Sequence, residues 1–284
     1  MSRRTWTTHV FAVAAFAGLA VAFVGLPRPD AVLGNATDDV FTHLHLIFWQ
    51  AYEAARGHPV PIQNNLILYP DGGKIWLSDP VGGLVVAPVA WLAGAAAGYN
   101  LLLILDLVFA GWAMFWLVRR MTGNAGAAFA AGTAFAFCAF HLAQVANGVI
   151  ETLTGGWLAL FLGFLLTATD AERYATPGRA APAIGAAAVS WWFASVGSHW
   201  YHGVFAAALF AGVLIDRAFG PMSRRALRHG VLVAVVYAVL VAPVVLLFLG
   251  TTSSGGTVTR SFDPSAVIGA QNPQFSERRR AAGS

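Results

Sequence analysis

The chain has 284 residues, of which 57% are hydrophobic and 11% are charged, and its formal net charge at pH 7 is +4. Its apolar residues form long runs and its mean hydropathy is +0.64, which excludes an ordinary water-soluble domain and indicates one polytopic membrane protein. The basic residues lie mostly in short loops beside these runs, so the positive charge needs no nucleic-acid partner. A single cysteine, Cys138, excludes a disulfide within the chain and a thiolate metal cluster.

Eight apolar runs predict the membrane elements. The first, 9–26, follows "MSRR". We interpret it as an uncleaved anchor rather than a signal peptide, because the run is long and "GLPRPDA" offers no small-x-small cleavage site. The runs 153–168 and 203–215 are shorter than the roughly 20 residues that a spanning helix needs, so we expect them to recruit flanking residues. The other runs cover 80–98, 99–118, 125–143, 180–196 and 231–250.

The arginines predict which ends of these runs share a membrane face. Most of them lie before the first run and after the third, fifth and seventh, and the positive-inside rule makes that face cytoplasmic. Three crossings between Arg4 and Arg119 would put these two residues on opposite faces, so one of the three runs must not cross. We expect that run to be 80–98, because Pro80, Pro88 and several glycines suit a broken helix.

The predicted fold is therefore an all-α polytopic membrane helix bundle with about seven crossings. We expect one transmembrane domain over 1–250, with an external loop at 28–79 that carries an amphipathic helix. The amino terminus is expected in the cytoplasm. Residues 251–284 are expected to form an external flexible tail, truncated if the chain is a fragment.

The external loop contains "GNATDDVFTHLHLIFWQAYEAARG", in which apolar residues recur at helical spacing. This pattern predicts an interfacial helix capped by Thr37 or Asp38. Asp39 and His43 lie one turn apart on its polar side, where a carboxylate and an imidazole can share a divalent ion or pass a proton. The alternative is a capped helix with a solvated polar face, because acids at a helix start also complement the helix dipole.

Two further acids have both a structural and a functional interpretation. Asp79 precedes Pro80 at the start of an apolar run, where a carboxylate typically caps a helix. Asp106 lies within a predicted span, where a bare acid costs about 3 kcal/mol, so it should face a partner or water. It is either a helix–helix hydrogen-bonding group or a proton-relay residue, and the second role would favour a transporter.

The stretch "GSHWYHG" carries histidines and aromatic residues on the predicted outer face. His199 and His202 are three residues apart, a spacing compatible with metal binding. Trp200 and Tyr201 are typical of a membrane interface, and sugar rings also stack on tryptophan. The alternative is an aromatic belt with solvated histidines beside it.

Four blocks in order, "YPDGG", "YNLL", "VRRMTG" and "LAQ", resemble the amino-terminal half of bacterial C-type (GT-C) membrane glycosyltransferases, in particular a poorly characterised multispan branch. The resemblance covers roughly residues 34–166. It implies an all-helical core, a catalytic acid in the first external loop and a polyprenyl-phosphate-linked sugar as donor. The chain departs from the pattern at Ala139 and His141, where related proteins have a proline and a basic residue. These departures leave a fragment or a reduced relative of such an enzyme as an alternative.

The resemblance implies transfer of a sugar to an envelope acceptor on the outer face of the bacterial inner (cytoplasmic) membrane. Asp38 and Asp39 would supply the catalytic base, or would bind Mg²⁺ or Mn²⁺ together with His43. Membrane lipid and the lipid-linked sugar are the expected partners. The alternative is a non-enzymatic membrane protein, either a transporter or an assembly subunit. The residues expected to contact substrate are His43, His141, Gln144, Glu151, His199, Trp200 and His202.

Overall fold

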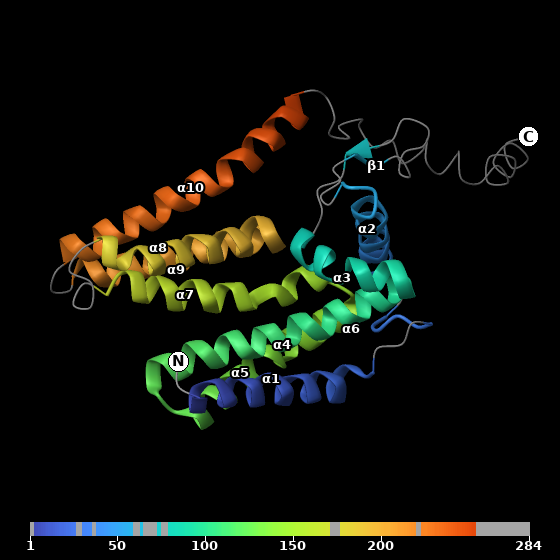
Figure 1. Cartoon of the computed structure of the whole chain (residues 1–284), viewed down its shortest axis with the longest axis horizontal. Helices are drawn as coiled ribbons and strands as arrows, with labels where there is room; N and C mark the ends of the chain where they lie inside the picture. Colours follow the sequence, from blue (N-terminus) through green and yellow to red (C-terminus); the bar gives the residue numbers. More distant parts are fainter. Residues whose placement is uncertain are drawn as a thin grey trace, which may run out of the picture. The chain divides into compact units, whose positions relative to one another are not determined.

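The computed structural model describes residues 3–26, 30–35, 38–58, 63–64, 73–74, 79–170, 177–219 and 223–253. The chain divides into two compact units, one of Met1–Ile62 with Ile75–Val245 and one of Gln63–Lys74 with Leu246–Ser284. The described residues are almost entirely helical (Figure 1), which confirms the predicted all-α membrane bundle. From residue 254 on, the predicted tail lies outside the described residues.

The elements follow one another along the chain with few long connections. They are α1 (Arg3–Val24), α2 (Asp38–Ala54), β1 (Gln63–Asn64), β2 (Gly73–Lys74), α3 (Pro80–Ala93), α4 (Ala95–Thr122), α5 (Ala125–Ala136), α6 (Ala139–Asn147), η1 (Ile150–Gly155), α7 (Gly156–Ala168), α8 (Pro177–Trp192), η2 (Phe193–Ser198), α9 (Trp200–Ala218) and α10 (Ser223–Ser253). The element η1 is a 3₁₀-helix and η2 is a π-helix. The two short strands pair antiparallel, with Gln63 opposite Lys74, and the predicted "YPDGG" turn falls mostly outside the described residues between them.

Seven helical segments among the described residues are long and apolar enough to cross a membrane: Trp6–Val24, Ala95–Thr122, Ala125–Asn147, Ile150–Ala168, Gly178–Ser198, Trp200–Ala218 and Arg224–Gly250. This number agrees with the prediction. The run 80–98 splits at Gly94, whose φ of +93° suits glycine. Its first part forms the 14-residue helix α3, which is too short to span. The two short predicted runs gain flanking residues, as expected.

The helices α1 and α4 pack antiparallel. His9, near the start of α1, lies 5.5 Å from Phe115 between ring centroids, close to the end of α4. Phe16 fits against two glycines, and a Cβ on Gly111 would lie 2.8 Å from its ring. The amino terminus and Arg119 therefore lie at the same end of the bundle, as they must if α3 does not cross.

The second half of the bundle continues this arrangement. The helix α7 runs parallel to α4, since Gly156 packs against Phe109 and Gly163 against Trp116. His229 Nδ1, near the start of α10, lies 2.9 Å from the carbonyl oxygen of Ala168 at the end of α7. Seven described arginines thus share one end, here called the arginine end: Arg119, Arg120, Arg179, Arg217, Arg224, Arg225 and Arg228. The helices α2 and α3 lie at the other end (Figure 1), here called the polar end.

A buried asparagine fixes the segment that leads from α1 to the polar end. Asn100 Nδ2 donates to the carbonyl oxygen of Ala31 over 2.7 Å, and Asn100 Oδ1 accepts from the amide of Leu33 over 2.9 Å. The asparagine is fully buried near the start of α4. One amide side chain thereby satisfies a backbone donor and a backbone acceptor 67 and 69 residues away.

Asn100→Asp is expected to destabilise the protein by about 1–3 kcal/mol, because a carboxylate cannot donate to the Ala31 carbonyl. The measurement is thermal unfolding in detergent. Asn124→Asp is the matched control, since Asn124 only caps α5 by accepting from the amide of Ala127, and aspartate caps as well. Equal melting temperatures for the two variants would contradict this stabilising role of the Asn100 side chain.

Candidate functional site

The helix α2 brings a buried histidine to an acid from a distant part of the chain. Val40, Ile47 and Ala51 are buried along its predicted apolar stripe. His43 is also buried, and its Nε2 lies 2.7 Å from Oε2 of Glu151, in the first turn of η1. The imidazole of His43 therefore faces Glu151, a residue that the sequence also placed among the substrate contacts.

A second histidine approaches the same 3₁₀ turn from α9. The hydroxyl of Thr154 donates to the carbonyl oxygen of Glu151 over 2.8 Å and lies 3.1 Å from Nδ1 of His202. A hydroxyl has one proton to donate, so Nδ1 of the neutral His202 ring must carry the hydrogen in this contact. The lone pair at Nε2 of His202 then remains available as an acceptor or as a base.

His199 stands at the junction of η2 and α9. Its Nδ1 accepts from the amide of Tyr201 over 3.3 Å and so caps α9. Burial lowers the pKa of His199, and the charge of Glu151 acts in the opposite direction. The neighbouring Trp200 is 61% exposed and its ring packs 4.0 Å from that of Tyr201. The two residues suit the entrance to a site rather than its interior.

The structure adds Asp79, which the sequence analysis interpreted as a helix cap. The cap is present, because Oδ1 accepts from the amide of Gly82 over 3.0 Å. The Asp79 amide also donates to the carbonyl oxygen of Ser198 over 2.7 Å, which joins the start of α3 to η2. Its φ of +49° lies in the left-handed region. Asp79 is only 3% exposed, and its Oδ2 has no hydrogen-bond partner among the described residues.

Burial raises the pKa of Asp79 to about 7. The hydrogen bond from Gly82 and the positive charge available on His43 act in the opposite direction, and Glu151 raises the pKa further. A carboxyl group with a pKa near neutrality can accept or release a proton under physiological conditions. Asp79, His43, Glu151, His199 and His202 are together called the acid–histidine cluster.

A groove of about 360 Å³ begins at this cluster. Three of its lining residues carry polar side chains: Asp79, Thr154 and Asp106. The remaining lining residues are apolar or glycine and come from α1, α3, α4 and α7: Val13, Val81, Gly82, Val85, Leu102, Leu105, Val108, Phe109, Trp112 and Trp157. The groove therefore connects a polar site with an apolar surface.

The remaining predicted site residues belong to α2 and α6. Asp39 is exposed in the first turn of α2, and the side chain of Asp38 lies outside the described residues. His141 is buried in α6, with Nδ1 3.3 Å from the carbonyl oxygen of Ala136. Gln144 is half-buried, and its carbonyl oxygen accepts from the amide of Val149 over 3.0 Å.

No group of three or more His, Cys, Asp or Glu side chains in the described part of the chain is arranged to hold a metal ion. A divalent ion bound by Asp38, Asp39 and His43 stays a prediction, since the side chain of Asp38 lies outside that part. His43 has Glu151 as its partner at 2.7 Å.

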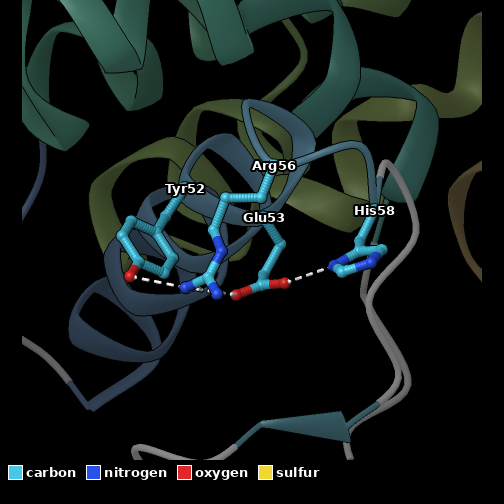
Figure 2. A network of polar contacts seen from close by, with 4 residues as sticks. All are labelled: Tyr52, Glu53, Arg56 and His58. Carbon is cyan, nitrogen blue, oxygen red and sulfur yellow. Dashed lines mark hydrogen bonds and ion pairs between the residues drawn. The ribbon is translucent and has the colours of Figure 1, made fainter.

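The far end of α2 has a separate polar network (Figure 2). Glu53 Oε2 lies 2.9 Å from Nδ1 of His58, and Arg56 donates to the hydroxyl of Tyr52 over 2.7 Å. The Arg56 guanidinium also lies over the Tyr52 ring. Arg56 and His58 are exposed, so these contacts hold the turn after α2 with little effect on stability.

The sequence analysis did not identify Thr154 as a site residue, and it interpreted Asp79 only as a helix cap. Neither residue carries a signal of its own, because a threonine in an apolar run and an aspartate before proline are both common. The burial of Asp79 depends on η2, which lies more than 110 residues further along the chain. Asp106, which the sequence analysis expected to face a partner or water, is buried and lines the groove.

The fold and the site define a polytopic membrane protein with a buried acid–histidine cluster at one end of its helical bundle. The chain belongs to the family described as a domain of unknown function, DUF6311, whose model matches residues 8–270. No curated protein and no solved structure matched the chain. The matched residues include six of the seven spanning segments in full, the first from residue 8 on, and the whole acid–histidine cluster.

Proposed function

We propose that the chain is a membrane glycosyltransferase that transfers a sugar from a polyprenyl-phosphate donor to an envelope acceptor. The observation that carries this proposal is the acid–histidine cluster at the polar end of a membrane bundle. Such a transfer needs a base for the acceptor and donors or cations for the leaving phosphate. The cluster offers carboxylates for the first need and imidazoles for the second.

The proposed roles follow from burial and contacts. Asp79 is the favoured base, because its pKa is about 7 and its Oδ2 has no hydrogen-bond partner among the described residues. His199 and His202 are the favoured phosphate contacts, since both lie at the start of α9 beside Glu151 and Thr154. Glu151 orients His43 across 2.7 Å. Asp38 and Asp39, at the start of α2, are the acids to which the GT-C resemblance points.

We place the polar end outside the cell and the arginine end in the cytoplasm of a bacterium, with the bundle in the inner membrane. The positive-inside rule supports this orientation, because seven described arginines gather at the arginine end, against Arg56 in the turn after α2. The lipid-linked donor would then reach the cluster from the outer leaflet. The amino terminus would lie inside, and the segment after α10 outside.

Cysteine labelling tests the orientation. In a Cys138→Ala background, Ala55→Cys is expected to react with a membrane-impermeant thiol reagent added to intact cells, because Ala55 is exposed just after α2. Met121→Cys, which is exposed at the arginine end, is expected to react only after the cells are opened. Labelling of Met121→Cys alone from outside would reverse the orientation.

Transfer by the purified protein tests the activity itself. Wild type in proteoliposomes is expected to transfer labelled sugar from at least one member of a panel of polyprenyl-phosphate donors. If the resemblance places the base correctly, Asp39→Asn or Asp38→Asn abolishes transfer without lowering the melting temperature, because asparagine caps a helix about as well as aspartate. Full activity in both variants would remove these residues from the site. No transfer by folded wild type would favour a transporter or an assembly subunit.

A further inference from the structure

Two buried carboxyl groups line the groove. Asp106 is 7% exposed and Asp79 is 3% exposed. Each has an Oδ2 atom that accepts no hydrogen bond from any described residue. The two acids interact electrostatically, and both contribute to the wall of the groove. Buried acids of this kind cost several kcal/mol each unless a positive group compensates them, and such acids inside a membrane commonly mark a ligand site.

The other walls suit the same kind of ligand. Phe109, Trp112 and Trp157 contribute aromatic rings, and the Phe109 and Trp157 centroids lie 4.7 Å apart. Aromatic faces attract cations, most strongly where water is excluded. Val85 at the groove edge is 60% exposed, and Val13 is 40% exposed. Because Val13 belongs to a spanning segment, we infer that this edge of the groove faces the bilayer.

We propose that this groove binds a lipophilic cation, an apolar body with one positive charge that Asp79 and Asp106 neutralise. The same two carboxylates repel a lipid phosphate, so the groove and the histidines of the cluster separate ligands of opposite charge. This site shares Asp79 with the proposed transfer reaction, but its binding is measured without any sugar donor, so the two proposals can fail separately. A lipid with an ammonium headgroup and a water-soluble organic cation share the chemistry that the groove recognises.

Two ions of the same size and opposite charge test the proposal. Wild type in nanodiscs of zwitterionic phosphatidylcholine is expected to bind tetraphenylphosphonium saturably, after subtraction of uptake by empty discs. Tetraphenylborate has the same shape and a negative charge, and it is expected to show no saturable binding. Equal binding of the two ions, or no saturable binding of either, would overturn the proposal.

Asparagine variants locate the site. Asp79→Asn and Asp106→Asn are each expected to weaken tetraphenylphosphonium binding by about tenfold or more, and the double variant is expected to abolish it. Asp216→Asn is the matched control, because Asp216 is exposed at the arginine end and the charge change is the same. Wild-type affinity in both single variants would overturn the proposal.

A change of pH and the addition of competing cations test the proposal on the wild-type protein alone. Lowering the pH from 8 to 6 is expected to weaken binding to wild type, because Asp79 becomes protonated. The other groups that interact electrostatically with Asp79 are His43, Glu151 and Asp106. Unchanged affinity over this range would contradict a role for Asp79.

Competition by other cations identifies the source of the ligand. Displacement of tetraphenylphosphonium by octadecylammonium in the disc identifies a lipid source, and displacement by tetrapropylammonium in solution identifies a free solute. Displacement by neither would overturn the proposal.

Discussion

Asp79→Asn is expected to abolish sugar transfer while the protein stays folded. Asparagine keeps the oxygen that accepts from the Gly82 amide and tolerates the left-handed backbone at this position. It cannot take a proton from an acceptor. Wild-type transfer should rise with pH through about 7 as Asp79 loses its proton. The measurement is transfer in proteoliposomes between pH 5 and 9, with thermal unfolding of the same samples.

The stability of the same variant provides an internal check. A raised pKa means that the folded state binds the Asp79 proton more tightly than the unfolded state does, so this contribution to stability is lost as the pH rises through about 7. The melting temperature of Asp79→Asn should therefore exceed that of wild type by more at pH 8 than at pH 5. Asp79→Ala should instead melt lower, because it loses the cap. Full transfer by a folded Asp79→Asn protein would leave Asp79 as a structural cap alone.

Breaking the contact between His43 and Glu151 is expected to have the next largest effect. Both side chains are mostly buried, so His43→Gln or Glu151→Gln should each destabilise the protein by about 3 kcal/mol and abolish transfer. The double variant should lose less free energy of unfolding than the two single variants lose together, and the difference is a coupling energy of about 1 kcal/mol or more. Denaturant or thermal unfolding of the four proteins in detergent measures this coupling.

A second histidine–glutamate contact, between the end of α2 and the turn after it, is the control for this cycle. His58 and Glu53 lie 2.9 Å apart, but the His58 side chain is 66% exposed. The same glutamine substitutions there should show a coupling of about 0.5 kcal/mol or less and leave transfer unchanged. Similar coupling energies for the two pairs would show that burial does not strengthen the contact between His43 and Glu151. That result would contradict the predicted contribution of this contact to stability.

The number of helices able to span the membrane could be predicted because it depends on local properties. The length of an apolar run decides whether a helix can span, and Gly94 and the prolines of 80–98 lie within the run that they interrupt. The arginines added a constraint between distant segments, since Arg4 and Arg119 had to share an end. His9 beside Phe115 satisfies that constraint.

The site could be predicted only in part, because its contacts join segments far apart in the chain. The residue types were informative, and His43, Glu151, His199 and His202 do lie around one turn of 3₁₀-helix. The sequence did not indicate which of these residues would contact one another. Helical spacing placed Asp39 beside His43, whereas His43 faces Glu151, 108 residues away. Spacing within one helix fixes which residues share a side, and tertiary packing decides what that side meets.

Photocrosslinking of a donor analogue tests most directly the claim that the polar end binds a lipid-linked phosphate. A polyprenyl phosphate with a diazirine next to the phosphate would be illuminated with wild type in nanodiscs, and the labelled peptides would be mapped by mass spectrometry. The account predicts adducts in α2, in η1 and around His199–His202, with competition by unlabelled polyprenyl phosphate. Adducts confined to the arginine end, around Arg119 or Arg224, would contradict it.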